Sequence, residues 1–328
     1  MNVVEFGQTG NPAEVLKFKP VAELEPGPGE AKVNVLAAPI HPANLAQIEG
    51  AYLAPVPELP ATPGMEGVGQ VAALGEGVDH LSVGQSVLLT GAGGTWRDTI
   101  VAPAAAFTPA PPGDIEQLAM LAVNPLTAHL LLEDYADLQP GDWVIQSAAN
   151  SAVDEMVIQL AAQRGLKTVN VVRREELILP LKALGATVVL VDGPDLAERV
   201  KQATDGADIK LALEAVSGST FYRLIEALAY GGTLVAYGNM SGDEPQIDLR
   251  SLIADDIRLR GFWLSRWYER TSPDEKQATL GQLVPLIASG QIKTKIDSRY
   301  PLEEISEAVT RAAAGGRDGK VLLTPNHA

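Results

Sequence analysis

The fold is decided by residues 141–159, which read GDWVIQSAANSAVDEMVIQ. Residues 143–146 predict a short apolar strand after a polar turn, and residues 155–164 place apolar side chains at helical spacing. Gly165 is a natural end for that helix, and residues 168–172 predict the next strand. This strand–helix–strand unit places its first turn where a dinucleotide pyrophosphate would meet the N-terminus of a helix.

The turn itself is unusual for nucleotide binding, because Ala149, Ser151 and Asp154 stand where a Gly-x-Gly-x-x-Gly pattern is expected. The backbone N–H groups of residues 150–153 can still point at a phosphate. A carboxylate at position 154 would bring negative charge close to a pyrophosphate, and Asp154→Gly should then bind the nucleotide about tenfold more tightly. The alternative is a plain turn in which Asp154 caps the helix.

Composition and charge limit the class of protein. A chain of 328 residues is long enough for two domains, and its net charge of −16 argues against nucleic-acid or anionic-membrane partners. The absence of cysteine excludes disulfides, thiolate catalysis and Cys-ligated zinc. No apolar run reaches the length of a membrane span, and the N-terminus lacks a signal-peptide pattern, so we expect a soluble cytoplasmic protein.

Two kinds of patterning divide the chain. The first hundred residues carry short β-like runs at 31–36, 68–74 and 86–90, separated by Gly- and Pro-rich turns, which predict a mostly β, partly barrel-like domain. After residue 114, strands and helices alternate and predict a doubly wound parallel sheet. We expect a catalytic (substrate) domain at 1–124, completed by 268–328, a dinucleotide-binding domain at 125–267, and a ligand cleft between them.

Arg173 and Arg174 stand at the end of the second strand of the unit, where NAD-binding sheets usually place an acidic residue. Arginine suits the 2′-phosphate of NADPH instead. The alternative is that both arginines only form a solvated end of the strand. The two acidic residues that follow, Glu175 and Glu176, favour this alternative.

Tyr52 lies in a Gly- and Pro-rich loop of the first domain. A loop tyrosine is usually an amphipathic packing residue, but at a cleft its phenol could donate a proton or polarise a carbonyl. The histidines show no zinc-ligand spacing, so we expect surface or packing roles and no metal. They are His41, His80, His129 and His327.

Separated motifs give the chain a resemblance to a known family. They are GAY (50–52), PELP (57–60), EGVGQV (66–71), GTWR (94–97), VNPLTA (123–128), LQPGD (138–142), VIQ (144–146), NS (150–151), NVVR (170–173), YGNM (237–240) and LRGFWLS (259–265). Together they resemble the medium-chain dehydrogenase/reductase superfamily and, within it, the zinc-independent 2-enoyl thioester reductases of the mitochondrial type. Met65 stands where the zinc-dependent alcohol dehydrogenases carry a histidine ligand.

The resemblance implies a Rossmann-type sheet, a GroES-like catalytic domain, and NADPH-dependent reduction of trans-2-enoyl thioesters, linked to CoA or acyl carrier protein, in fatty acid metabolism. It places the catalytic tyrosine at Tyr52. It also implies cofactor contacts at Asn124, Asn150, Ser151, Ala152, Val153, Arg173, Arg174, Tyr237, Gly238, Asn239, Met240, Phe262, Trp263, Leu264 and Lys320. The family's Ser-Gly-Val-Gly turn is here Ser-Ala-Val-Asp at 151–154, and its Arg-Asp-Arg is here Arg-Arg-Glu at 173–175.

Two rival functions remain at this point: an NADPH quinone or activated-alkene oxidoreductase of the same superfamily, and a non-catalytic or weakly nucleotide-binding protein on the same fold. An acidic carrier protein would need a local basic patch. Its candidates are Lys293, Lys295, Arg299, Arg266 and Arg270. The apolar strand expected at 257–264, whose edge would otherwise be exposed, favours a homodimer.

Overall fold

The structure, a computed structural model, describes residues 1–326, which form two compact units. The first unit combines Met1–Val123 with the chain from Leu280 onward, and the second unit is Asn124–Thr279. The boundary expected before residue 268 therefore lies inside the second unit. Among the described residues, no helix combines the length and the apolar character that crossing a membrane requires.

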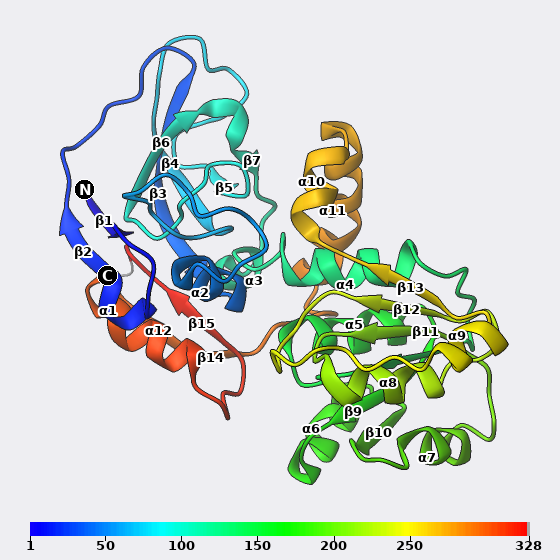
Figure 1. The fold of residues 1–328 in the computed structure, drawn as a ribbon. Coiled ribbons are helices and arrows are strands. Elements are labelled where there is room, and N and C mark those ends of the chain that lie inside the picture. Colours follow the sequence, from blue (N-terminus) through cyan, green and yellow to red (C-terminus); the bar gives the residue numbers. More distant parts are fainter. Residues whose placement is uncertain (327–328) are drawn as a thin grey trace. The chain divides into compact units, whose positions relative to one another are not determined.

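The second unit is built on a six-stranded parallel sheet (Figure 1). Its order is β10-β9-β8-β11-β12-β13, and every neighbouring pair is parallel, which confirms the doubly wound prediction. The order reverses between β8 and β11, the topological switch point where such sheets bind ligands. The strands are β8 (Trp143–Gln146), β9 (Lys167–Val172), β10 (Val188–Val191), β11 (Ile209–Glu214), β12 (Thr233–Ala236) and β13 (Arg258–Gly261).

Helices connect these strands and bury their apolar faces on the sheet. Helix α5 begins three residues earlier than the apolar periodicity predicts, because Ser151 is its N-cap and accepts a hydrogen bond from the Asp154 backbone N–H. The helices of this unit are α4 (Asn124–Glu133), α5 (Ala152–Gln163), η2 (Glu175–Leu177), α6 (Ile178–Ala183), α7 (Leu196–Ala203), α8 (Gly218–Glu226), α9 (Leu249–Ala254) and α10 (Leu264–Arg270). Helix α11 (Pro273–Ala288) continues from the second unit into the first.

The first unit is a mostly β structure with a short hairpin and a larger sheet (Figure 1). The hairpin pairs β1 (Asn2–Phe6) with β2 (Leu16–Pro20). The sheet runs β14 (Ile296–Tyr300), β15 (Lys320–Leu323), β3 (Glu30–Pro39), β4 (Val68–Leu74), β5 (Ser86–Leu88) and β7 (Thr108–Pro109), with β6 (Thr99–Pro103) also paired to β3. Its helices are α1 (Pro12–Val15), α2 (Pro42–Glu49), η1 (Ala104–Ala106), α3 (Ile115–Leu118), η3 (Leu302–Glu304) and α12 (Ile305–Ala313).

The C-terminal segment is part of this first sheet. Strand β15 pairs antiparallel with β3, through Leu322 opposite Pro39 and Leu323 opposite Ala38. The buried side chains of β15 and α12 belong to the same apolar core as those of β3. The first unit is therefore assembled from the two ends of the chain.

Candidate functional site

Four of the predicted cofactor-binding segments lie at one edge of the parallel sheet. They directly follow β8, β9, β12 and β13, and the carboxyl ends of parallel strands lie at the same edge of the sheet. The segments are 150–153, 173–174, 237–240 and 262–264. Asn124, also predicted, is the buried first residue of α4.

The N-terminus of α5 presents unpaired donors at this edge. Ala148 adopts a left-handed conformation with φ of 48°, and the Ser151 N–H donates to its carbonyl at 2.7 Å. In the described chain, the N–H groups of Ala152 and Val153 have no acceptor. Free N–H groups at the start of a twelve-residue helix suit a phosphate, so this turn fits a dinucleotide without the expected glycines.

The Asp154 side chain does not point toward the free N–H groups that suit a phosphate. Its side chain is 0% exposed, and its Oδ2 lies 2.5 Å from Ser151 Oγ and 2.6 Å from the Tyr237 hydroxyl. Burial raises the pKa of Asp154 to about 7, although hydrogen bonds from Ser151 and Tyr237 oppose that shift. The expectation of a carboxylate projecting toward the pyrophosphate is therefore wrong, because the side chain turns inward beneath the turn.

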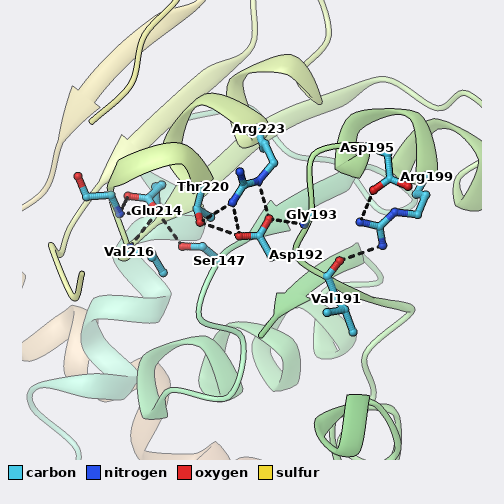
Figure 2. A network of polar contacts seen from close by, with 11 residues as sticks. Ser147, Val191, Asp192, Gly193, Asp195, Arg199, Glu214, Val216, Thr220 and Arg223 are labelled. Carbon is cyan, nitrogen blue, oxygen red and sulfur yellow. Dashed lines mark hydrogen bonds and ion pairs between the residues drawn. The ribbon is translucent and has the colours of Figure 1, made fainter. Parts of the chain in front are cut away.

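Other acids at this edge are held by the protein itself (Figure 2). Glu214, at the end of β11, accepts hydrogen bonds from Ser147 Oγ and from the N–H groups of Val216 and Ser217. Burial raises its pKa. These contacts fix the loop between β11 and α8, and they use the Glu214 carboxylate to bind groups of the protein itself.

Asp192, just past β10, forms a bidentate pair with Arg223 at 2.7 and 2.6 Å, and Thr220 donates to it at 2.7 Å (Figure 2). Burial alone would raise the pKa of Asp192, but the hydrogen bonds from Arg223 and Thr220 lower it. The negative charge of Asp192 is thus neutralised locally.

The two arginines after β9 differ from one another. Both are exposed, but Arg174 pairs with Glu176 at 2.9 Å, whereas Arg173 has no ion pair or hydrogen bond within residues 1–326. Arg173 is therefore the better placed to bind an added anion.

Two predicted site residues belong to the first unit. Helix α2 ends at Gly50, which has a left-handed φ of 77°, and Tyr52 follows in the next loop with a half-buried side chain. Lys320 begins β15 and is buried.

Lys320 is one end of a buried polar chain that the sequence did not predict. Its Nζ lies 3.0 Å from Nδ1 of His41, and Nε2 of that ring lies 2.7 Å from Oε1 of Glu66. A lysine ammonium only donates, so Nδ1 accepts, and the ring donates its Nε2–H to Glu66. His41 is thus a connecting residue between two charges, and no local sequence signal marks it because Lys320 is 279 positions away.

Burial controls the protonation of this chain. It raises the pKa of Glu66 and lowers those of Lys320 and His41, while the opposite charges of Glu66 and Lys320 each oppose the shift of the other. The other Glu66 oxygen accepts the Ala122 N–H at 2.8 Å. Glu66 therefore holds the last residues of the first unit in place.

The remaining histidines vary in position. His80 is exposed, His129 is half-buried, and His327 lies outside the described residues. Within residues 1–326, no group of three or more His, Asp or Glu side chains is arranged to hold a metal ion.

Most members of the expected basic patch are paired with acids. Lys295 pairs with Asp318 at 2.9 Å, and Arg299 Nη2 lies 2.6 Å from Glu116. With Lys293, these residues line a depression of about 250 Å³ in the first unit. Arg266, in the second unit, pairs with Glu269 at 2.5 Å. These pairs reduce the local positive charge available to an acidic carrier protein.

Comparison with known proteins agrees with this architecture. One family model, described as an alcohol dehydrogenase GroES-like domain, matches residues 27–112, and another, described as a zinc-binding dehydrogenase, matches residues 152–281. The chain is 38% identical to the human mitochondrial enoyl-[acyl-carrier-protein] reductase, over 97% of this chain and 87% of that protein. It is 39% identical to the Caenorhabditis elegans enzyme of the same name, over 92% and 89%.

Solved structures give the same result. The complex of Etr1p with NADP and crotonyl-CoA has a TM-score of 0.89 and 27% identity, covering 98% of this chain and 99% of that one. The mitochondrial 2-enoyl thioester reductase Etr1p/Etr2p heterodimer from Candida tropicalis has a TM-score of 0.87 and 26% identity, with the same coverage. A mycobacterial quinone oxidoreductase has a TM-score of 0.85 and 29% identity, covering 99% and 100%.

Proposed function

Because this chain belongs to the mitochondrial-type enoyl thioester reductases of the medium-chain dehydrogenase/reductase superfamily, we propose that it reduces the C2=C3 double bond of trans-2-enoyl thioesters with NADPH. The observation that carries this proposal is the edge of the parallel sheet, where free N–H groups of α5 and exposed Arg173 present donors suited to an anionic dinucleotide. Relatives named enoyl reductases, and a neighbour solved with NADP and crotonyl-CoA, support the substrate class.

The proposed roles of the residues follow from the reaction. NADPH, when bound, supplies the hydride that adds to the carbon β to the thioester carbonyl. The N–H groups of Ala152 and Val153 would bind its pyrophosphate, and Arg173 its 2′-phosphate. Hydride addition makes a thioester enolate on the substrate, so the site needs a donor for the oxygen or a proton for the α carbon. Tyr52 is the proposed donor.

A second candidate function is NADPH-dependent reduction of quinones or other activated alkenes. It is favoured by the mycobacterial quinone oxidoreductase among the structural neighbours and by the paired state of the basic side chains. An assay of NADPH oxidation with crotonyl-CoA, and separately with a quinone, distinguishes the two. Turnover on crotonyl-CoA alone supports the proposal, and turnover on the quinone alone contradicts it. NADPH binding with no turnover on either would favour the non-catalytic alternative.

Arg173→Ala is expected to weaken NADPH binding by about 1.5–3 kcal/mol, the range for hydrogen bonds to charged groups, and to leave NADH binding nearly unchanged. The matched control is Arg174→Ala, whose effect should be smaller because Arg174 already pairs with Glu176. Fluorescence titration with both cofactors measures the four affinities. Equal losses for NADPH and NADH in the Arg173 variant would show that this arginine does not read the 2′-phosphate.

A homodimer joined through β13 is the proposed assembly. Strand β13 is an edge strand, paired with β12 on one side, and an unpaired edge favours an isologous two-fold contact. One structural neighbour is described as a heterodimer, which supports pairing of subunits in this family. Light scattering at micromolar protein should give twice the chain mass of 34.6 kDa, and a monomer mass would contradict the proposal.

The cytoplasmic location expected from the sequence stays a prediction, since the relatives are named mitochondrial.

A further inference from the structure

Asp154 links two separate segments of the nucleotide-binding edge. It lies in the first turn of α5, and its Oδ2 contacts Ser151, the N-cap of that helix. The same oxygen contacts the hydroxyl of Tyr237, 83 positions later, in the loop after β12. The other oxygen, Oδ1, is buried and has no partner among the described residues. Both partners of Asp154 belong to the predicted cofactor site, so the carboxyl group ties two of its segments together.

We propose that Asp154 is a positioning residue of the nucleotide site that acts in its protonated form, so that NADPH binding takes up one proton. The inference rests on the proposed function, because it concerns the same site.

The direction of the hydrogen bonds gives the first reason. An ionised carboxylate only accepts, so it takes the hydroxyl protons of both Ser151 and Tyr237 and leaves neither for a ligand. A protonated carboxyl can donate its own O–H to Ser151 Oγ. The Ser151 proton then becomes available for a phosphate oxygen. One proton on Asp154 thus changes Ser151 from an occupied donor to a free one.

The surrounding charges give the second reason. The negative charge of Glu214 of β11 disfavours ionisation of Asp154, and Tyr237, in the loop after β12, and Ser151 contribute only hydroxyl groups. From β8, Gln146 donates to the Asp154 carbonyl at 3.0 Å and does not reach its carboxyl. Among the described residues, the groups that shift the pKa of Asp154 include no cation. A phosphate bound at the N-terminus of α5 adds further negative charge, which favours the protonated form of Asp154 still more.

The sign of the pH dependence follows by linkage. If the complex holds the proton more tightly than the free protein, affinity is unaffected at pH values where free Asp154 is already protonated. The affinity falls as the pH rises above about 7, where free Asp154 ionises, by up to tenfold per pH unit. The fall ends where the complex itself loses the proton.

The test compares the wild type with Asp154→Asn, which keeps the volume and cannot ionise. NADPH dissociation constants are measured by fluorescence from pH 6 to pH 9, and the 2′-phosphate of NADPH titrates alike with both proteins. We expect the ratio of the two constants to change by roughly tenfold or more across this range, with the wild type weakening at high pH. Calorimetry of the wild type in two buffers of different ionisation enthalpy should show net proton uptake near pH 8. This measurement does not depend on the folding of the variant.

A constant ratio, or no proton uptake by the wild type, would overturn the role of Asp154 while leaving enoyl reduction intact. No NADPH binding by the wild type at any pH would overturn the proposed function as well, so the two failures are distinguishable.

Discussion

Replacing the Tyr52 hydroxyl with hydrogen, in Tyr52→Phe, is expected to lower turnover on enoyl thioesters by roughly 10²–10⁴-fold, the usual contribution of a positioned proton donor. The phenyl ring keeps the packing of this half-buried side chain, so the melting temperature and NADPH affinity should change little. Steady-state kinetics with crotonyl-CoA, together with thermal unfolding, measure both effects.

Tyr230→Phe is the matched control, because Tyr230 is 78% exposed on the second unit and should leave turnover unchanged. Full turnover by the Tyr52 variant would remove this phenol from the mechanism. A large fall in melting temperature would instead indicate that Tyr52 acts through the fold.

Glu66→Ala is expected to lower the free energy of unfolding by about 3–5 kcal/mol, the cost of breaking a buried charge pair by removing one partner. The substitution leaves the His41 ring and the Ala122 N–H without their acceptor, and the buried Lys320 without its counter-charge. Each buried polar group left unpaired adds its own desolvation cost. Urea unfolding of the variant and the wild type measures the difference.

Glu76→Ala provides the comparison, since Glu76 is exposed and its removal should change stability by no more than about 0.5 kcal/mol. Glu66→Gln, which keeps an oxygen for the Ala122 N–H, should fall between the two. A Glu66→Ala variant as stable as the wild type would show that the buried chain contributes nothing to folding.

The parts of the fold that the sequence predicted are those set by local patterns. Strand β8 occupies Trp143–Gln146 and β9 occupies Lys167–Val172, close to the runs at 143–146 and 168–172 that the apolar pattern indicated. Strand β14 was not predicted, because Asp297 and Arg299 interrupt its apolar residues and its parallel pairing with β15 supplies the missing information.

The site was predictable where its residues follow the carboxyl ends of strands in the parallel sheet. The order of the strands alone placed residues 150–153 and 173–174 at one edge of the sheet. The inward direction of Asp154 depends on Tyr237, and the burial of His41 depends on Lys320, and neither pair has a local signal. This geometry favours the alternative in which Asp154 stabilises the start of α5, and the effect of Asp154→Gly on NADPH binding stays a prediction.

The pairing of β15 with β3 also determines the order in which a new chain can fold on the ribosome. The second unit is continuous in sequence and has all its strands once Thr279 has emerged, whereas the sheet of the first unit still lacks β14 and β15. About two hundred residues separate Val123 from Leu323, which takes on the order of tens of seconds of synthesis. Throughout that time the end of β3 that pairs with β15 lacks its partner strand. The polar chain of His41 and Glu66 also lacks Lys320. An unpaired strand edge promotes aggregation. We therefore expect the nascent first unit to depend on chaperone binding more than the second unit does.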